Sequence, residues 1–435
     1  MEFLDMNDDC LEHVFHFLDL KSVCTISETC KHLRRIAESC FKRHRYYKCH
    51  IGNEVNVKEA TKIIRKIGQY LSRLHLDFHP IDPEVYGENG IGCRFLSLLN
   101  SSLGERFCEL ELSGGEISSF PVLRLAPTFL KLQKLTIYCE YGEDSDDNVY
   151  GKEYAATFID LPQLCPNLRV LSIENCALIF APNPNKSFRN LEALEFYSFG
   201  KYYPIALLEC FFRQNKQLRK LYFDTIVDDI FSTTYIDLAI VADNLRDLEE
   251  LRIRTNVFDN CVQAIRDISG MHHLTTLAIS EYLDTIEDLN DILDALKTMK
   301  QLKAILIGWC FPDQIPNQQA IINIAKELKQ LEIFHVDLQC DENTIVECVR
   351  FGRSLKRFRV EFRPDRVVTT TFIKHLAKVR ESVAGSSHQP LLLYFAGAKL
   401  NGDVSKVIKE PDVTQHLKWK VMRDVSDDLF EQFTK

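Results

Sequence analysis

The hydrophobic residues of the chain follow one short pattern, apolar-x-x-apolar-x-apolar, which returns along most of its length. Its eleven copies begin at Leu71, Phe107, Leu132, Leu168, Leu191, Leu218, Leu248, Leu274, Leu302, Leu331 and Leu355. The last two apolar positions alternate with polar ones, as in a β-strand with one buried face. Successive copies start 23 to 36 residues apart, which is the length of a strand plus a returning helix. In the tenth copy, a second register that starts at Leu328 fits the sequence as well.

The stretches between the copies carry helical periodicity. One example, spaced i, i+3, i+4 and i+7 on a single helical face, comprises Leu289, Ile292, Leu293 and Leu296. A single strand-helix unit cannot bury its apolar face, whereas stacked units share a continuous core. The alternative is a series of unrelated amphipathic units, which the number of copies in the same phase disfavours.

This pattern resembles the leucine-rich-repeat family. The best copy, at 165–176, reads Cys-Pro-Asn-Leu-Arg-Val-Leu-Ser-Ile-Glu-Asn-Cys and is similar to the cysteine-containing subtype of that family. In that subtype, Cys or Asn at the ninth position bonds the turn after the strand. Only Cys176, Asn256 and Cys310 fill this position in the chain. The resemblance implies an α/β repeat fold, a horseshoe-shaped solenoid with parallel strands on its concave face and helices outside.

Residues 1 to 69 lack the repeat and carry helical stripes instead. One stripe, spaced i, i+3, i+4 and i+7, comprises Leu11, Val14, Phe15 and Leu18. Further helical stretches contain the apolar residues Val23, Ile26, Cys30, Leu33 and Ile36. Asp8 and Asp9 stand where the first helix should start, suited to capping it and to its positive dipole end. The pattern predicts a small all-α domain of three short helices with few core residues.

The segment 6–19 resembles the opening of an F-box, whose pattern is Leu-Pro-x-Glu-x-Leu-x-x-Ile-Phe-x-x-Leu. Met6, Asn7 and Asp9 replace the Leu, Pro and Glu of that pattern, and Leu33 replaces a common Trp. The resemblance covers about residues 3 to 44 and implies docking on the Skp adaptor of SCF-type ubiquitin ligases, and through it on cullin and RING subunits. The residues assigned to adaptor binding are Leu4, Met6, Leu11, Val14, Phe15, Leu18, Val23, Ile26 and Leu33. Alternatively, these residues pack against the first repeat as an N-terminal cap.

Together these patterns predict four regions along the chain. They are an F-box-like helical domain at 1–45, a linker or N-terminal cap at 46–70, the repeats at 71–388, and a last strand with a C-terminal cap or tail at 389–435. An F-box directly before leucine-rich repeats is a known family order, so each resemblance supports the other.

In a leucine-rich repeat, the polar positions of the strands point to the concave face. Acidic residues prevail there in the early and middle copies, arginines prevail in the late copies, and aromatic residues are candidate anchors. The residues predicted to bind a partner protein are Glu109, Glu111, Tyr138, Glu174, Glu195, Tyr197, Tyr222, Arg252, Arg254, Trp309, His335, Arg357 and Arg359. Opposite charges at the two ends can orient a charged partner. Alternatively, these charges only keep the protein in solution. An acidic run at 140–147 is expected to loop out of the solenoid.

Composition narrows the functional classes. The net charge is -9, and the chain as a whole lacks the basic footprint of a nucleic-acid-binding protein. No apolar run approaches the roughly 20 residues of a membrane span, and the acidic N-terminus lacks the basic start of a signal peptide. The 15 cysteines include no Cys-x-x-Cys pair, which indicates reduced thiols, no metal site, and a cytoplasmic or nuclear protein.

Catalytic signatures are missing as well. We find no GxxxxGK[ST], HExxH or GxSxG motif, so the sequence predicts no catalytic residue, no cofactor and no enzymatic activity. The function implied by both resemblances is the substrate-recognition subunit of an SCF-type E3 ubiquitin ligase, which holds a target protein near the ligase. The alternative is a leucine-rich-repeat scaffold or inhibitor that binds a protein partner without any link to a ubiquitin ligase.

Overall fold

The computed structural model divides the chain into two compact units. Unit 1 comprises Met1–Asn215 and unit 2 comprises Lys216–Lys435. The structure describes residues 6–78, 83–87, 90–114, 122–138, 161–174, 187–198, 205–225, 238–255, 261–281, 286–309, 317–362, 367–384, 389–396, 399–400 and 403–422. Several residues singled out from the sequence lie outside this description: Leu4, the acidic run at 140–147, Cys176, Asn256, Cys310 and the side chain of Trp309.

Unit 1 begins with three short helices, α1 Asp8–Phe15, α2 Leu20–Ile26 and α3 Lys31–Phe41. Asn7 caps α1, because its side-chain oxygen accepts the N–H of Cys10 at 2.8 Å, and Asp19 caps α2 in the same way. These bonds satisfy amide groups that the first helical turn leaves without a partner. The cap is therefore one residue earlier than the sequence suggests. Asp8 and Asp9 lie in the first turn, where their charge still favours the helix dipole.

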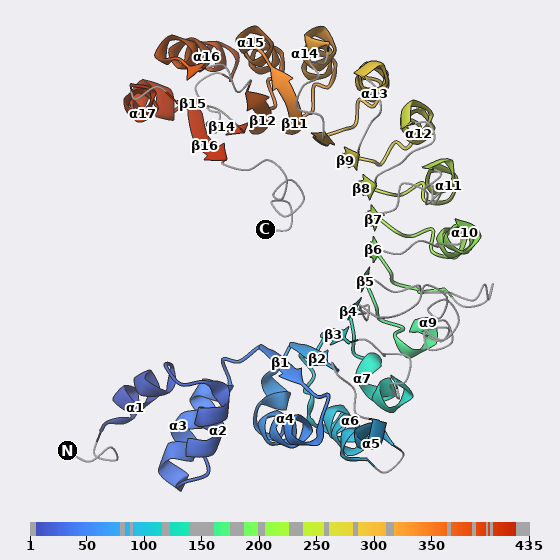
Figure 1. The fold of residues 1–435 in the computed structure, drawn as a ribbon, viewed down its shortest axis with the longest axis vertical. Helices are drawn as coiled ribbons and strands as arrows, with labels where there is room; N and C mark the ends of the chain where they lie inside the picture. Colours follow the sequence, from blue (N-terminus) through green and yellow to red (C-terminus); the bar gives the residue numbers. More distant parts are fainter. Residues whose placement is uncertain are drawn as a thin grey trace. The chain divides into compact units, whose positions relative to one another are not determined.

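The described part of unit 1 holds six parallel strands, paired in sequence order (Figure 1). They are β1 Tyr46–His50, β2 Arg73–Asp77, β3 Glu109–Ser113, β4 Lys134–Tyr138, β5 Val170–Glu174 and β6 Ala193–Ser198. The triplets align across the strands, and one buried row consists of Leu74, Leu110, Leu135, Leu171 and Leu194. Such rows form the continuous core that no single repeat could build.

Helices follow these strands and cover one of their faces (Figure 1). They are α4 Glu54–Ile67, α5 Pro83–Tyr86, α6 Ile91–Ser102, α7 Ala126–Phe129, α9 Leu161–Leu164 and α10 Ile205–Gln214, with 3-10 turns η2 Gly68–Tyr70 and η4 Val122–Leu125. Helix α4 also packs against α2. Lys66 on α4 donates to Ser27 Oγ at 2.7 Å and lies 3.2 Å from Glu28. The N-terminal helices and the first repeats are therefore packed together within unit 1.

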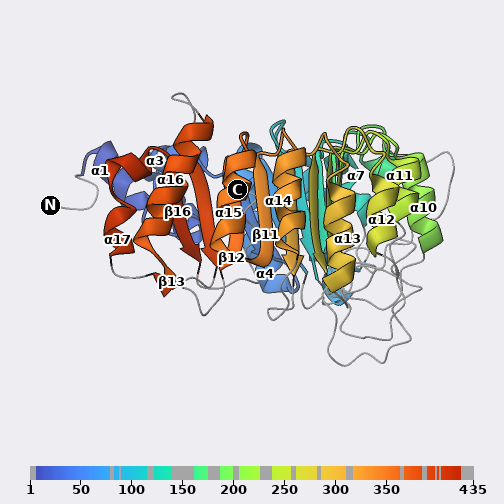
Figure 2. The same cartoon turned by 90° about the horizontal axis from the view of Figure 1, so that it is seen from above.

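Unit 2 has the same alternation of parallel strands and outer helices. Its main strands are β7 Lys220–Thr225, β8 Glu250–Thr255, β9 Thr276–Glu281, β10 Ala304–Trp309, β11 Ile333–Cys340, β12 Arg357–Phe362, β14 Leu391–Ala396 and β16 Leu417–Met422. Its helices are α11 Leu238–Asn244, α12 Cys261–Ile268, α13 Ile286–Leu296, α14 Gln318–Glu327, α15 Glu342–Phe351, α16 Thr370–Ala384, α17 Val404–Val407 and α18 Pro411–Thr414. Figure 2 shows α12 to α16 side by side along these strands. A separate small sheet pairs β13 Val367–Val368 with β15 Lys399–Leu400.

Strand β11 settles the register that the sequence left open. Phe334 and Val336 are buried, whereas Ile333 is half-buried, so the copy runs Leu331-Phe334-Val336. The ring of Phe334 stacks on that of Phe358 in β12, with centroids 5.7 Å apart. The buried row at this position of unit 2 is therefore aromatic, where the row of Leu74 and Leu110 in unit 1 consists of leucines.

A row of polar side chains links successive repeats just before their strands. In each case, the residue before the first apolar position of the triplet donates to a carbonyl of the preceding repeat. The pairs are Asn167 with Leu130 (2.8 Å), Asn190 with Pro166 (3.0 Å), Gln301 with Met271 (2.9 Å) and Ser354 with Lys329 (2.7 Å). These bonds give turn carbonyls of one repeat a hydrogen-bond partner in the next repeat. They do so at a position other than the ninth position that the family pattern suggests.

The α/β repeat predicted from the sequence is confirmed in both units. Four strands of the described chain lack a triplet and escaped prediction, namely β1 in the expected linker or cap, β16 in the expected C-terminal cap, and the short strands β13 and β15 of the second sheet. Among the residues that the structure describes, no helix combines the length and apolar character needed to cross a bilayer.

Candidate adaptor and partner surfaces

The apolar residues of the three N-terminal helices divide between an interior and a surface. The predicted adaptor-binding residues that are buried, each at most 6% exposed, are Leu11, Phe15, Val23 and Leu33. The half-buried ones are Met6, Val14, Leu18 and Ile26. The first group fills the core of the helices, so only the second group offers surface to a partner in this structure.

Helix α1 and the turn after it present a second apolar stripe to solvent, which we call the exposed stripe. It consists of Cys10, Val14 and Phe17, spaced i, i+4 and i+7. The side chain of Phe17 is 78% exposed, and its ring meets that of His13 edge-on at 5.1 Å. The spacing was visible in the sequence, but the more apolar stripe that starts at Leu11 masked it.

Ion pairs fix α1 against α3. Arg35 lies 2.5 Å from Asp8, and His32 lies 3.3 Å from the same carboxylate. Arg43 pairs with Glu12 one turn further along α1. These exposed pairs each contribute little to stability, yet together they orient the helix that carries the exposed stripe.

We call the strand face opposite the helices the open face; it corresponds to the concave face expected from the sequence. Alternate residues of each strand belong to it because side chains alternate along a strand. In the first three strands these are Tyr46, Lys48, His50, Arg73, His75, Asp77, Glu109, Glu111 and Ser113.

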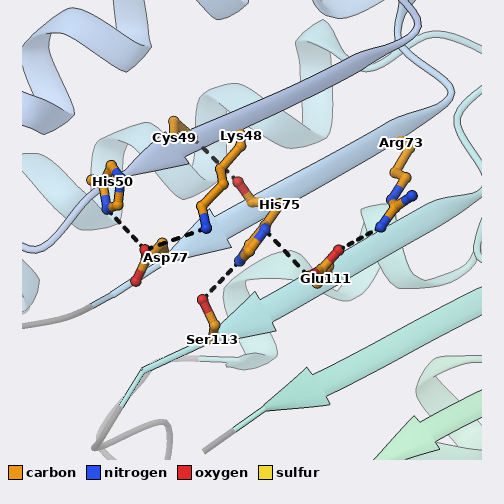
Figure 3. A network of polar contacts seen from close by, with 8 residues as sticks. All are labelled: Lys48, Cys49, His50, Arg73, His75, Asp77, Glu111 and Ser113. Carbon is orange, nitrogen blue, oxygen red and sulfur yellow. Dashed lines mark hydrogen bonds and ion pairs between the residues drawn. The ribbon is translucent and has the colours of Figure 1, made fainter. Parts of the chain in front are cut away.

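Figure 3 shows a polar network on this face, centred on His75. The Nε2 atom of His75 lies 2.7 Å from Ser113 Oγ, and its Nδ1 atom lies 3.2 Å from a carboxylate oxygen of Glu111. The other oxygen of Glu111 accepts a hydrogen bond from Arg73 at 2.8 Å. Burial lowers the pKa of His75 below its ordinary value, and the nearby Glu111 only partly opposes this shift.

The order Ser113, His75, Glu111 is that of a nucleophile, a base and an acid. Acyl transfer also needs N–H groups aimed at the developing oxyanion. The N–H of Gly114, next to Ser113, donates to Tyr138 O at 3.1 Å and is therefore engaged in the sheet. The three side chains thus form a polar connection between β2 and β3 rather than a complete catalytic site.

The outer end of the network joins β1 to β2. Asp77 lies 2.8 Å from His50 Nδ1 and 4.0 Å from Lys48 Nζ (Figure 3). At the other end of the strands, the guanidinium of Arg73 lies over the ring of Tyr46, 5.0 Å from its centroid. Each base on this part of the open face is therefore held by a neighbour on the next strand.

The remaining predicted partner-binding residues of unit 1 are half-buried on the open face. They are Glu109, Tyr138, Glu174, Glu195 and Tyr197. Glu111 belongs to the same face, but Arg73 and His75 contact its carboxylate. The acidic character expected of this region therefore rests mainly on the glutamates of β3, β5 and β6 that lie outside the network.

The first strands of unit 2 carry charge pairs. Arg252 donates to Glu250 at 2.6 Å, and Arg254 lies 3.7 Å from Asp224. Burial raises the pKa of Asp224, while Arg254 and a 3.5 Å hydrogen bond from the hydroxyl of Tyr222 oppose the shift. The two arginines predicted to bind a partner are thus compensated by carboxylates on neighbouring positions.

The predicted residues on β11 and β12 differ widely in exposure. Arg357 is exposed, whereas Arg359 and His335 are buried, at 0% and 1%. The rings of His335 and Tyr394 come from the strands on either side of β12 and lie 5.6 Å apart. Burial, followed by the charges of Arg359 and Arg357, lowers the pKa of His335 to about 3. Partner binding by Arg359 and His335 stays a prediction, and their burial disfavours it.

Three residues of the open face were missed from the sequence because they lie on β1. They are Tyr46, Lys48 and His50. The signal in the sequence was an alternation of apolar and polar positions that ends in Cys49 and Ile51. Both side chains are buried in the structure. It lacks leucine and is short, so the repeat pattern did not include it.

Comparisons with known proteins identify the N-terminal helices. Residues 3–45 match the F-box domain family. No curated protein sequence matches the chain. Among solved structures, TLR13 in the TLR13-ssRNA13 complex aligns with 89% of this chain at 14% identity and a TM-score of 0.44; the alignment spans only 56% of the TLR13 chain. The leucine-rich repeat-containing protein LegL7 from Legionella pneumophila aligns over 79% of this chain and 98% of its own, at 9% identity and a TM-score of 0.44.

The family match covers the N-terminal helices, and the observed fold describes the rest of the chain. Residues 3–45 match the F-box domain, and parallel strand-helix repeats follow them in the described part of both units. F-box domains bind Skp-type adaptors. Among the described residues, no group of three or more His, Cys, Asp or Glu side chains is placed to hold a metal ion.

Proposed function

We propose that the chain is the substrate-recognition subunit of an SCF-type E3 ubiquitin ligase. The F-box docks on a Skp-type adaptor, the adaptor joins cullin and RING subunits, and the open faces of the repeats bind a target protein. The observation that carries this proposal is the exposed stripe, Cys10, Val14 and Phe17, on a domain that matches the F-box family. Cys10 and Phe17 are exposed and Val14 is half-buried, and an apolar surface of this kind is one that a partner can cover.

The proposed mechanism is positioning. Lys66 bonds to Ser27, and Lys21 pairs with Glu59 at 2.5 Å, so α4 and the F-box helices are joined within unit 1. A target on the open face of unit 1 is then held at a set place relative to the adaptor, which raises the effective concentration of its lysines near the ligase. In this proposal the chain itself does no bond chemistry and works in the cytoplasm or nucleus.

Co-purification with a Skp-type adaptor tests the proposal. The combined change Val14→Glu and Phe17→Glu should weaken adaptor binding at least about 100-fold, because it places charge in an apolar contact. Leu130→Glu, at a 51% exposed leucine after α7 in the same unit, is the matched control and should leave binding unchanged. Leu11 and Phe15 are unsuitable for this test, because their substitution would open the core of the F-box.

Circular dichroism should show that both variants keep the helical content of the parent chain. A folded chain that never binds the adaptor contradicts the ligase role and leaves the scaffold function. Unchanged binding by the Val14 and Phe17 variant would contradict the role of the exposed stripe itself.

A further inference from the structure

Three bases on the open face of β1 and β2, which we call the basic patch, are more exposed than the acids beside them. The side chains of Lys48, His50 and Arg73 are 46%, 61% and 50% exposed. Those of Asp77 and Glu111 are only 12% and 23% exposed. A ligand that approaches this face from solvent therefore meets the bases first, while the acids lie deeper and hold them in place.

The basic patch is ordered before any ligand arrives. Arg73 is fixed between the Tyr46 ring, 5.0 Å away, and Glu111, which accepts one hydrogen bond at 2.8 Å out of the five that a guanidinium can donate. Lys48 Nζ stays 4.0 Å from Asp77, which is too far for a hydrogen bond. Donors therefore remain for a ligand, and little side-chain freedom is lost when it binds.

We propose that the basic patch binds an extended acidic segment of a protein, through side-chain carboxylates at alternate positions. Lys48 and His50 are two residues apart on one strand, so their Cα atoms lie about 6.6 Å apart, which is also the spacing of alternate residues in an extended peptide. Arg73 is aligned with Tyr46 on the adjacent strand, level with the alternate position before Lys48, and its planar head suits a carboxylate. The inference rests on the proposed function and names the chemistry of the target segment that unit 1 holds.

A nucleic acid fits this surface less well. Asp77 and Glu111 lie directly beside the bases, so the basic patch has little net charge to attract a phosphate backbone from a distance. Binding must come from short, directed bonds to a few spaced carboxylates, which an acidic peptide offers.

A fluorescently labelled dodecapeptide of alternating Glu and Ser tests the proposal by anisotropy with the full chain. We expect it to bind at least about tenfold more tightly than the same peptide with Gln in place of Glu. The combined change Lys48→Gln and Arg73→Gln should weaken binding at least about tenfold. Lys58→Gln is the matched control, since Lys58 is also exposed, at 60%, and pairs with Glu54 on the helix face of unit 1. Equal binding of the two peptides, equal loss in the control, or tighter binding of a 12-nucleotide single-stranded RNA overturns the proposal.

A second variant protects the test against misfolding. Removing Arg73 leaves the half-buried Glu111 with less compensation, whereas Lys48→Gln alone breaks no hydrogen bond to Asp77. We expect Lys48→Gln to weaken peptide binding about threefold or more, and unchanged binding counts against the proposal. Adaptor binding is measured on the same samples. A chain that binds the adaptor but not the peptide overturns this inference alone, and one that binds the peptide but not the adaptor overturns the ligase role alone.

Discussion

The open face of β2 in unit 1 and that of β11 and β12 in unit 2 use the same residue types in opposite ways. In unit 1, Arg73 is half exposed and bonded to an acid, and His75 bridges an acid and a hydroxyl. In unit 2, Arg359 is fully buried and His335 packs against the ring of Tyr394. Both surfaces are built on the same strand-helix repeat.

The difference comes from the residues aligned on neighbouring strands. His75 is aligned with Glu111, which supplies a carboxylate at hydrogen-bonding distance. His335 is aligned on one side with Leu306, which is buried and uncharged, and on the other with Arg359, whose positive charge disfavours a protonated ring. The backbone decides which face a side chain joins, and its row neighbours decide whether a charge on that face stays accessible. A charged residue in the sequence is therefore a poor guide to whether its charge is exposed at the surface.

The largest expected effect is a loss of stability in unit 2 alone. Phe358 is buried and stacks on Phe334, so Phe358→Ala should lower the free energy of unfolding by about 3–5 kcal/mol. Since repeats contact mainly their neighbours, hydrogen exchange should show the loss in β11, β12 and β14 of unit 2. Phe358→Leu, which keeps most of the volume, should cost less. An equal loss of protection in unit 1 would contradict the expectation that the destabilisation stays in the strands around β12.

The second prediction sharpens the contrast between the two histidines through pH. Burial lowers the pKa of His335 from 6.5 to about 3, so between these values the unfolded chain binds a proton that the folded chain does not. The stability is therefore fully present above about pH 6.5 and is lost as the pH falls toward 3, by about 1.4 kcal/mol per pH unit. His335→Gln should remove this slope, as measured by urea unfolding at pH 7, 6, 5 and 4.

The matched change, His75→Gln, should remove a smaller part of the slope. Burial lowers the pKa of His75 as well, but the carboxylate of Glu111 favours the protonated ring and opposes the shift. The two variants are compared with the parent chain under the same urea series. Equal pH slopes in both variants would show that the acid beside His75 has no such effect.

The smallest expected effect separates a paired arginine from an exposed one. Arg73→Ala should lower the free energy of unfolding by about 0.5–1 kcal/mol, since it removes a partly exposed ion pair with Glu111. Arg357 is exposed and forms no ion pair within the described residues, so Arg357→Ala should stay within about 0.5 kcal/mol of the parent. Thermal unfolding at low and high salt checks this, because salt should shrink the effect at Arg73. A larger effect at Arg357 would reverse the comparison.

The repeats were predictable because their signal is local and occurs many times. Buried triplet residues such as Leu74, Leu135 and Ile253 follow directly from the apolar spacing. The candidate surfaces were less predictable. Arg357 and Arg359 look alike in the sequence, yet one is exposed and the other is buried. In the F-box, the same helical spacing contains both a buried stripe and the exposed stripe, and only the packing of α1 on α3 tells them apart.

The sequence by itself determined that a small helical domain precedes strand-helix repeats and which strand positions share a face, because both depend on periods of a few residues. Only the tertiary structure decided that β1 joins the open face, that Glu111 is paired and that Arg359 is buried. These outcomes depend on contacts between strands far apart in the chain: Arg73 and Glu111 are 38 residues apart and 2.8 Å from each other. No local pattern contains such a contact, since stacking of the repeats creates it.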